Sequence, residues 1–238
     1  MQSIEESVRL FNEGWAIYQK IIRNNYMFHR EIGEAVSHYL AAYFGEKPIR
    51  LMDLGCGDAS QTITAVSRCK LDYYHGCDVS AVALDLADEN LVRADVKYVL
   101  ENSDMLQCVA VPGLAFDVMF SSFAMHHLDH AQKSDFLKKV RAGLKPDGLL
   151  ILVDLALNPG EDRAAYLENY LDYAEAHWSE ITARENAAIR DHASSHDYPE
   201  RLTTYRQLSM EAGFSEPLHL CRYTWHHVWV LRNQMPVN

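Results

Sequence analysis

The strongest constraint on the fold lies in residues 49–60, which read IRLMDLGCGDAS. The apolar run that ends in Asp53 has the length of a buried parallel strand. Gly55 and Gly57 then allow the backbone to turn sharply and to approach a ligand closely. The residues after this turn have helical character. A strand, a glycine-rich turn and a helix in this order predict a small ligand at the carboxyl edge of an open α/β sheet.

This turn differs from the dinucleotide-binding fingerprint. The pattern G-x-G-x-x-G requires a third glycine at position 60, where this chain has serine. Asp53 also stands just before the glycines, where a pyrophosphate would meet a second negative charge. A carboxylate there suits a ligand with a positively charged amine. We therefore predict that the turn, with Cys56 between its two glycines, holds a cationic group.

Acidic residues follow the next two predicted strands. Residues 71–78 form the first of these strands and end in Asp78, which Val79 follows. An acid about 20 residues beyond a glycine-rich turn, at the tip of the next strand, can accept both hydrogen bonds of a ribose diol. Asp104 comes after a third short strand, where it can accept from an exocyclic amine while Met105 packs against the ring. Each acid could instead be an ordinary turn residue.

A second informative stretch covers residues 116–128, FDVMFSSFAMHHL. Its apolar start predicts a buried fourth strand, and Ser121 and Ser122 are small enough to let a ligand lie close to the backbone at the strand end. His126 and His127 titrate near neutral pH and suit removal of a proton from an acceptor. The alternative is that both histidines only form hydrogen bonds to a neighbouring helix or loop.

The pattern of elements predicts the fold class. Five strand candidates alternate with helices, which favours a doubly wound, mostly parallel sheet with helices on both faces. Two β-rich runs at the end of the chain predict a closing antiparallel pair. We expect an N-terminal helical cap at 1–46, an α/β domain formed by 47–157 and 201–238, and a helical lid insertion at 158–200.

Polar and aromatic residues flank the predicted pocket from three directions. The candidates for acceptor binding are Tyr18, Tyr26 and His29 in the cap, Asp154 at the end of the fifth strand, and Arg163, His192 and His196 in the lid. The aromatic members could instead pack between helices. His192 and His196 are four residues apart, so on a continuous helix they could share a metal, with Asp154, Asp197 or His29 completing the site. Nearby serines and a proline argue against a continuous helix there.

Composition limits the partners. The formal net charge of −11 and the lack of a Lys/Arg cluster oppose binding to nucleic acid. The chain has no apolar run of about 18 residues and no basic, apolar leader, so we expect neither a membrane span nor a signal peptide. Its five cysteines lack C-x-x-C spacing, which indicates reduced thiols and a cytoplasmic protein. A small molecule is the expected partner, and the oligomeric state stays open.

Taken together in order and spacing, these motifs resemble the class I S-adenosylmethionine-dependent methyltransferases over residues 49–231. The matching pieces are DLGCG at 53–57, the strand-end Asp78, NSD at 102–104, FDVMFSSFAMHHL at 116–128, LKPDGLLILVD at 144–154 and EAGF before the last two strands. The resemblance implies a Rossmann-like sheet of seven strands in which the last is antiparallel.

The resemblance also implies the cofactor and its contacts. S-adenosyl-L-methionine would bind, and S-adenosyl-L-homocysteine would be the product. Asp53, Gly55, Cys56 and Gly57 would hold the methionine portion. Asp78 with Val79 would bind the ribose, Asp104 with Met105 the adenine, and Ser121 with Ser122 would pass under the sulfonium.

The leading hypothesis is a small-molecule methyltransferase. The acceptor would lie between the N-terminal helices, the lid and the edge of the fourth strand, and no metal would be needed. The N-P-P-Y motif that positions a nucleobase amino group is missing after the fourth strand, which favours small acceptors. Two alternatives stay open: a protein that binds the cofactor without methyl transfer, and a metal-assisted methyltransferase that uses the lid histidines.

Overall fold

The structure is a computed structural model that describes residues 4–109 and 115–234, with residues 4–13 described by their backbone alone. Within these ranges the strands are β1 (Ile49–Leu54), β2 (Leu71–Asp78), β3 (Tyr98–Asn102), β4 (Phe116–Ser122), β5 (Leu144–Leu157), β6 (Glu200–Arg201), β7 (Leu218–Tyr223) and β8 (His226–Arg232). The helices are α1 (Ile4–Arg23), α2 (His29–Phe44), α3 (Ser60–Ala65), α4 (Ala81–Arg93), α5 (Met105–Cys108), α6 (His130–Gly143), α7 (Arg163–His177), α8 (Ala183–His196), α9 (Leu202–Glu211) and the short 3-10 helix η1 (Met125–His127).

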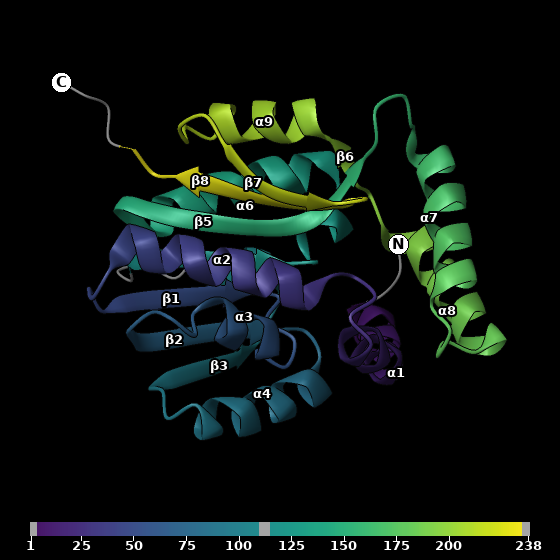
Figure 1. Ribbon diagram of the computed structural model, residues 1–238, viewed down its shortest axis with the longest axis horizontal. Helices are drawn as coiled ribbons and strands as arrows, with labels where there is room; N and C mark the ends of the chain where they lie inside the picture. The colour runs from purple at the N-terminus through teal and green to yellow at the C-terminus, as the bar shows by residue number, and fades with distance from the viewer. Residues whose placement is uncertain (1–3, 110–114, 235–238) are drawn as a thin grey trace.

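A single twisted sheet forms the centre of the molecule (Figure 1), with strand order β3-β2-β1-β4-β5-β8-β7. β1 to β5 run parallel, β8 runs antiparallel to β5, and β7 runs antiparallel to β8. This order confirms the predicted doubly wound sheet with an antiparallel last strand. The structure adds one strand that the sequence analysis lacks, because the two residues of β6 pair with β5.

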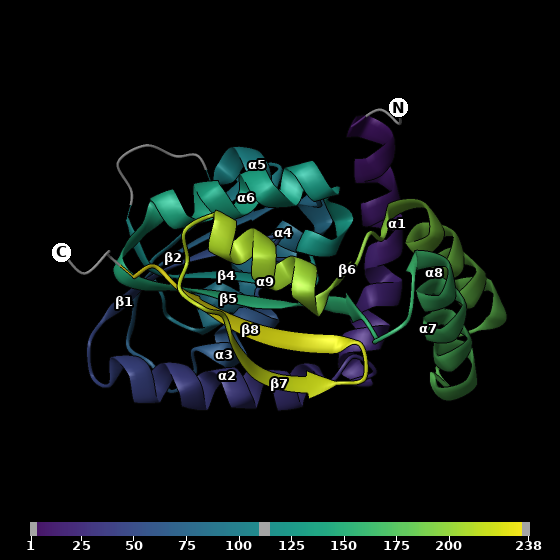
Figure 2. The same cartoon turned by 90° about the horizontal axis from the view of Figure 1, so that it is seen from above.

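Helices cover both faces of the sheet, as Figures 1 and 2 show. The side chains of α2, α3 and α4 pack on one face, and those of α5, α6 and α9 pack on the other. Alternate residues of β5 enter the two cores: Leu149, Ile151 and Val153 enter one, whereas Leu150 and Leu152 enter the other. The continuous apolar run of β5 follows from this burial on both faces.

The remaining helices lie at one end of the sheet. Figures 1 and 2 both place α1, α7 and α8 beyond the carboxyl ends of the parallel strands. The insertion predicted to be helical forms α7 and α8. α8 continues unbroken to His196, so the expectation that serines and a proline interrupt it is wrong. The Thr182 hydroxyl and the Glu185 side chain cap its start reciprocally.

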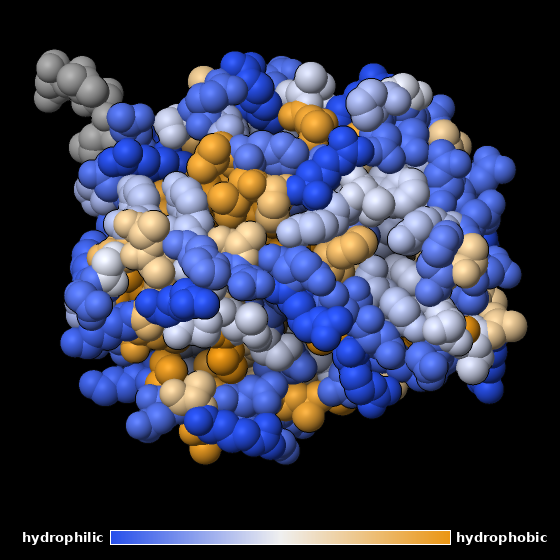
Figure 3. Space-filling view, in the orientation of Figure 1, coloured by the Kyte–Doolittle hydropathy of each residue, from blue (hydrophilic) through white to orange (hydrophobic). Residues whose placement is uncertain are grey.

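Hydrophilic residues cover most of the surface seen in Figure 3, and apolar residues appear there in separate groups. Within the described ranges, no helix combines the length and the apolar character needed to cross a bilayer.

Truncation of Ile151 to alanine tests the double-sided core. Ile151 is fully buried in the middle of β5, so we expect Ile151→Ala to lower the free energy of unfolding by about 2–5 kcal/mol through lost burial and a residual cavity. Urea unfolding followed by circular dichroism measures this change. Val92→Ala, at an exposed position of α4, is the control and should change stability by about 0.5 kcal/mol or less. Equal effects of the two substitutions would contradict the described packing.

Candidate active site

The glycine-rich turn after β1 is tightly enclosed. Gly55 and Gly57 have φ values of +77° and +52°, which favour glycine. A Cβ atom on Gly55 would lie 2.7 Å from Ala124, and one on Gly57 would lie 2.9 Å from the ring of Trp15 in α1. The turn therefore sits between α1 and the segment after β4, with no room for a side chain. Sequence reasoning missed Trp15, which no motif distinguishes from an ordinary helix-packing residue.

Asp53 lies beneath this turn. Its side chain is 1% exposed, and its Oδ2 atom accepts hydrogen bonds from the Thr62 hydroxyl at 2.5 Å and the Tyr74 hydroxyl at 2.7 Å. Burial raises the pKa of Asp53 to about 7, although both hydrogen bonds oppose this rise. Thr62 and Tyr74 are further contributors to the site that the sequence analysis missed.

Asp78 joins the tip of β2 to the turn. Its Oδ2 atom accepts from the Gly57 N–H at 2.8 Å, and its Oδ1 atom accepts from the Ser80 N–H at 2.8 Å. Burial raises the pKa of Asp78, whereas these backbone donors lower it. A carboxylate offers about four lone-pair sites, more than these backbone donors occupy, so Asp78 can accept a further hydrogen bond from a ligand. Val79 follows it and is half-buried.

Asp104 lies beside Asp78 because β3 ends next to β2. The Ser103 N–H donates to the Asp78 carbonyl oxygen at 3.1 Å. Asp104 caps α5, with Oδ1 accepting from the Leu106 N–H at 2.8 Å. Met105 is buried directly after it. The two acids predicted to bind adjacent parts of one ligand are therefore neighbours in the structure.

The end of β4 contributes two hydroxyl groups. The Oγ atoms of Ser121 and Ser122 are buried, and neither finds a hydrogen-bond partner among the described residues. Buried hydroxyls are normally paired, so these two are available to a ligand or an ordered water molecule.

His126 and His127 follow β4 in η1 and meet two carboxylates. His126 Nδ1 lies 2.5 Å from Oδ1 of Asp154 in β5. His127 Nδ1 lies 3.3 Å from Asp197 Oδ1 and 3.4 Å from the His196 carbonyl oxygen. Both of these neighbours are acceptors, so the network assigns the proton of neutral His127 to Nδ1 and the lone pair to Nε2. Both contacts are to neighbouring elements, β5 and the end of α8, so the alternative of histidines bonded to a neighbouring helix or loop stays open.

Opposing effects set the pKa values of this group. Burial lowers the pKa of His126, but the charges of Asp154 and Asp197 outweigh it and raise the pKa above its usual value. Burial, followed by the charge of His126, lowers the pKa of His127. Burial would raise the pKa of Asp197, but the two histidines bring it down to about 2. At neutral pH, His127 is therefore a neutral imidazole beside an ionised carboxylate.

Within the described ranges, donor atoms of His126, His127 and Asp197 lie within 4.8 Å of one another. His126 Nδ1 bonds to Asp154, whereas His127 Nδ1 bonds to the His196 carbonyl oxygen and Asp197 Oδ1 has no hydrogen-bond partner among the described residues. The lid pair His192 and His196 is not part of this group. Their rings stack with centroids 5.0 Å apart, and His192 lies 5.3 Å from the His127 ring.

Tyr18 and His29 bring the N-terminal helices to the same edge. The Tyr18 hydroxyl lies 3.3 Å from His29 Nε2. Burial raises the pKa of Tyr18, and the charges of Asp58 and Asp78 add to this, so the phenol faces the acidic turn. Burial lowers the pKa of His29 to about 3, and its ring meets Phe123 edge-on at 5.3 Å. These residues form an uncharged aromatic wall.

Two other predicted contacts fasten the lid. The Tyr26 ring stacks on Trp178 with centroids 5.4 Å apart, and its hydroxyl accepts from the Glu180 N–H at 2.8 Å. Arg163 donates to the carbonyl oxygens of Asp197 at 2.7 Å and of Ser194 at 2.6 Å. Their polar groups thus bind within the protein, and Arg163 holds Asp197 in place.

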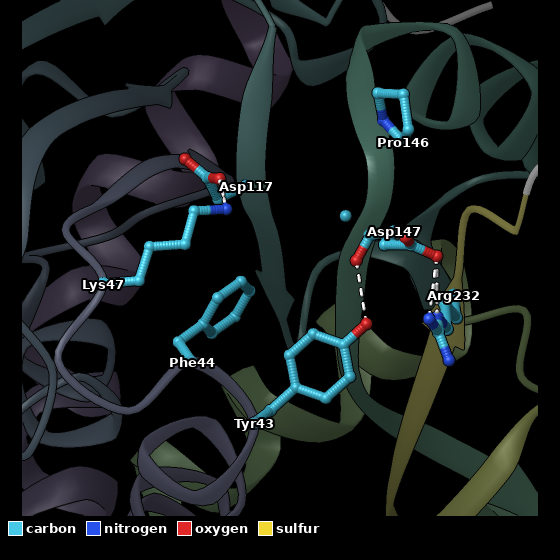
Figure 4. Close-up of a pocket in the computed structure, with 8 residues that line it drawn as sticks. Tyr43, Phe44, Lys47, Asp117, Pro146, Asp147 and Arg232 are labelled. Carbon is cyan, nitrogen blue, oxygen red and sulfur yellow. Dashed lines mark hydrogen bonds and ion pairs between the residues drawn. The ribbon is translucent and has the colours of Figure 1, made fainter.

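A cavity of about 370 Å³ lies at the opposite, amino-terminal edge of the sheet (Figure 4). Its charged side chains pair with one another: Lys47 contacts Asp117 at 2.8 Å, and Arg232 contacts Asp147 at 2.8 Å. The predicted site residues all lie away from it.

Comparison with known proteins identifies relatives of this chain. Residues 51–148 match the methyltransferase-domain family. Carboxy-S-adenosyl-L-methionine synthase from Campylobacter hominis is 26% identical over 207 residues, which cover 86% of each chain. Phosphoethanolamine N-methyltransferase from Plasmodium falciparum is 24% identical over 184 residues, covering 77% of this chain and 67% of that protein.

Solved structures show the same fold. The 1,6-didemethyltoxoflavin-N1-methyltransferase from Burkholderia thailandensis was solved with 1,6-didemethyltoxoflavin and S-adenosylhomocysteine bound. It superposes with a TM-score of 0.59 at 15% identity and covers 99% of this chain and 92% of its own.

Asp53 makes stability depend on pH. In the folded state, the Asp53 carboxyl keeps its proton up to about pH 7, whereas an aspartate in the unfolded chain loses its proton near pH 3.8. The stability associated with this proton is complete below pH 3.8 and is lost as pH rises through about 7. Relative to Asp53→Asn, the wild type should lose roughly 4 kcal/mol over this interval.

Urea unfolding of the wild type and Asp53→Asn across this pH range measures the difference. Asp85→Asn, on the exposed face of α4, should follow the wild-type curve. Parallel curves for the wild type and Asp53→Asn would show that Asp53 does not bind the proton as described.

Proposed function

We propose that this chain, which belongs to the class I S-adenosylmethionine-dependent methyltransferases, methylates a small molecule at the carboxyl edge of its sheet. The observation that supports this most directly is the meeting of four segments at one edge: the glycine-rich turn, Asp78, Asp104 and the end of β4. Polar groups for an acceptor lie beside them on η1, β5 and the lid.

The cofactor residues are proposed one segment at a time. Asp53, Gly55, Cys56 and Gly57 hold the methionine portion of S-adenosylmethionine, Asp78 and Val79 the ribose, and Asp104 and Met105 the adenine. Ser121 and Ser122 lie under the sulfonium, and their unpaired hydroxyls fit a polar ligand. Bound in this way, the cofactor supplies an activated methyl group, and S-adenosylhomocysteine is the product.

We place a small acceptor at this edge because of the residues that surround it. α1, α7 and α8 cover the edge, and the aromatic wall of Tyr18, His29 and Phe123 faces it. Asp154 Oδ2 is buried and has no hydrogen-bond partner among the described residues, so it can accept from a donor on the acceptor molecule. The names of both sequence relatives and of the toxoflavin-type structure refer to small molecules, which supports the same class here.

Acid–base chemistry is assigned to the histidines. The His196 carbonyl oxygen accepts from the Nδ1–H of His127, with Asp197 3.3 Å away, and we assign Nε2 as the atom that removes a proton from an O–H or N–H acceptor. His126, positioned by Asp154, supplies positive charge beside it. Arg163 and the lid histidines His192 and His196 position Asp197 and close the space, while Tyr26 fastens the lid to the cap.

We also propose that the protein works in the cytoplasm without a nucleic-acid partner. The net charge of −11 opposes a phosphate backbone, and the five free cysteines suit a reducing compartment.

The test of the function combines binding with turnover. Isothermal titration should show binding of both S-adenosylmethionine and S-adenosylhomocysteine. A panel of phenols, amines, N-heterocycles and carboxylic acids should then reveal acceptors that release S-adenosylhomocysteine. Absence of cofactor binding overturns the proposal. Tight binding with no product from any acceptor would favour a cofactor-binding protein that does not methylate.

Asp78 provides a direct prediction for binding. Asp78→Ala should weaken S-adenosylhomocysteine binding by about 10- to 100-fold, because hydrogen bonds to a charged acceptor contribute about 1.5–3 kcal/mol. Asp78→Asn, which keeps the shape and one acceptor, should lose less. Asp85→Ala, at an exposed position, is the control, and titration calorimetry is the measurement. Equal affinities of Asp78→Ala and the control would remove Asp78 from the cofactor site.

His127 provides a prediction for catalysis. His127→Gln should lower kcat by about 10²- to 10⁴-fold with S-adenosylhomocysteine affinity nearly unchanged. His130→Gln, at the exposed start of α6, is the matched control. A variant with full kcat would exclude His127 as the proton acceptor.

The pH profile of the wild type should agree. His127 is surrounded by His126, Asp154, Asp197 and His192, and its pKa lies below the usual value, with burial as the main cause. The rate should rise as His127 loses its proton below about pH 6.5 and fall at higher pH as His126, whose pKa is raised, loses its positive charge. Asp197→Asn should move this rise to lower pH, because the carboxylate raises the pKa of His127.

A further inference from the structure

A second cluster of histidine, cysteine and glutamate side chains, which are residue types that bind metals, lies near Asp78 and Asp104, the residues predicted to bind adenosine. In the parallel pairing of β2 and β3, Cys77 is opposite Glu101 and His75 is opposite Val99. Alternate residues of a strand share a face, so His75, Cys77 and Glu101 project from the same side of the sheet. Cys108, the last residue of α5, packs on that side in the same core as Cys77. Figure 2 shows α5 on this side, next to α6.

The donor atoms in this cluster are close together. His75 Nε2 lies 2.8 Å from Glu101 Oε1, and the donor atoms of His75, Glu101 and Cys108 all lie within 4.8 Å of one another. Cys77 packs in the same core as Cys108 but is not among the donors that lie this close together. All five cysteines of the chain are free, so Cys77 and Cys108 are not joined by a disulfide.

Burial makes the cluster a defined site with one open side. His75, Cys77 and Cys108 are 3%, 0% and 1% exposed, whereas the Glu101 side chain is 38% exposed. The closed side excludes water, and Glu101 provides a path for an ion from solvent. His75 Nδ1 is buried and has no hydrogen-bond partner among the described residues, so the cluster is not a fully satisfied hydrogen-bond network.

We propose that His75, Glu101 and Cys108 bind a zinc ion, with a water molecule as the fourth ligand. A thiolate, an imidazole and a carboxylate suit Zn²⁺, whereas Mg²⁺ and Ca²⁺ prefer oxygen. Binding releases the Cys108 thiol proton to solvent and involves no oxidation or reduction. This site is separate from His126, His127 and Asp197.

The position of the site gives the ion a role. It would link β2 to α5, and these two elements carry Asp78 and Asp104. The Cys77 carbonyl oxygen also accepts from the N–H groups of Gly55 at 3.0 Å and Cys56 at 2.9 Å. Zinc would therefore fix the glycine-rich turn and the two acids relative to one another. This role rests on the proposed function, whereas zinc binding itself does not.

Metal content and cobalt spectroscopy test the proposal. The untagged full chain, kept reduced, is loaded with Zn²⁺, dialysed against metal-free buffer and measured by plasma mass spectrometry. About one zinc per chain should remain. Replacement by Co²⁺ should give the absorption of a tetrahedral thiolate site. Cys108→Ser and His75→Gln should each lose most of the retained metal, and Cys108→Ser should weaken the thiolate band.

Two variants serve as controls. Cys221→Ser removes a half-buried thiol from β7, and Asp197→Asn alters the acid–base group of the active site. Both should retain zinc like the wild type. Trace metal in the dialysed wild type, a cobalt spectrum without thiolate character, or loss of metal in Asp197→Asn but not in Cys108→Ser would overturn the proposal. The metal content and the cobalt spectrum of the wild type test the proposal without any variant. They therefore remain decisive even if the Cys108→Ser protein does not fold.

The consequence for cofactor binding is measured separately. Zinc-loaded wild type should bind S-adenosylhomocysteine several-fold more tightly than chelator-treated protein. Retained zinc with unchanged affinity would reject the proposed role and leave the site intact. Absence of S-adenosylhomocysteine binding in both forms would instead contradict the proposed function.

Discussion

The hydrogen bond from the Gly57 N–H to the Asp78 carboxylate is the contact on which the rest of the site depends. It joins the turn after β1 to the tip of β2, two segments that only parallel pairing of these strands can bring together. Asp104, which follows β3, lies beside Asp78. The serine hydroxyls at the end of β4 lie on the other side of the turn. The sheet order thus brings four distant segments of sequence to one edge, where open α/β sheets commonly bind ligands.

The insertion that forms α7 and α8 contacts this edge of the sheet through charged and polar groups. Asp197, at the end of α8, reaches the histidines of η1, and Arg163 at the start of α7 binds its carbonyl oxygen. A buried carboxylate is costly unless it is compensated, and His126 and His127 provide the compensation. The lid is therefore held to the sheet by the same groups that are assigned to the chemistry, so substitutions at Asp197 act on both.

Local patterns predicted the sheet correctly and indicated which of its edges brings the candidate residues together. The strand-end acids, the glycine-rich turn and the histidine pair are contiguous in sequence or fixed by strand order, so the sequence reveals them. The partners of Asp53 were not predictable in the same way. Thr62 and Tyr74 belong to α3 and β2, and nothing in their local sequence shows that both hydroxyls turn toward one carboxyl. Trp15 was missed for the same reason, and Asp197 was considered only as a metal ligand, because their positions depend on where distant helices pack.

The buried position of Asp53 also links occupancy of the edge to the solution around it. With a pKa of about 7, this carboxyl is only partly ionised at neutral pH. A cationic group arriving above it would favour the ionised form, so a proton would leave as the ligand enters. Association at this edge then becomes an exchange of one cation for another, and acidification of the surroundings weakens it without any change in the fold.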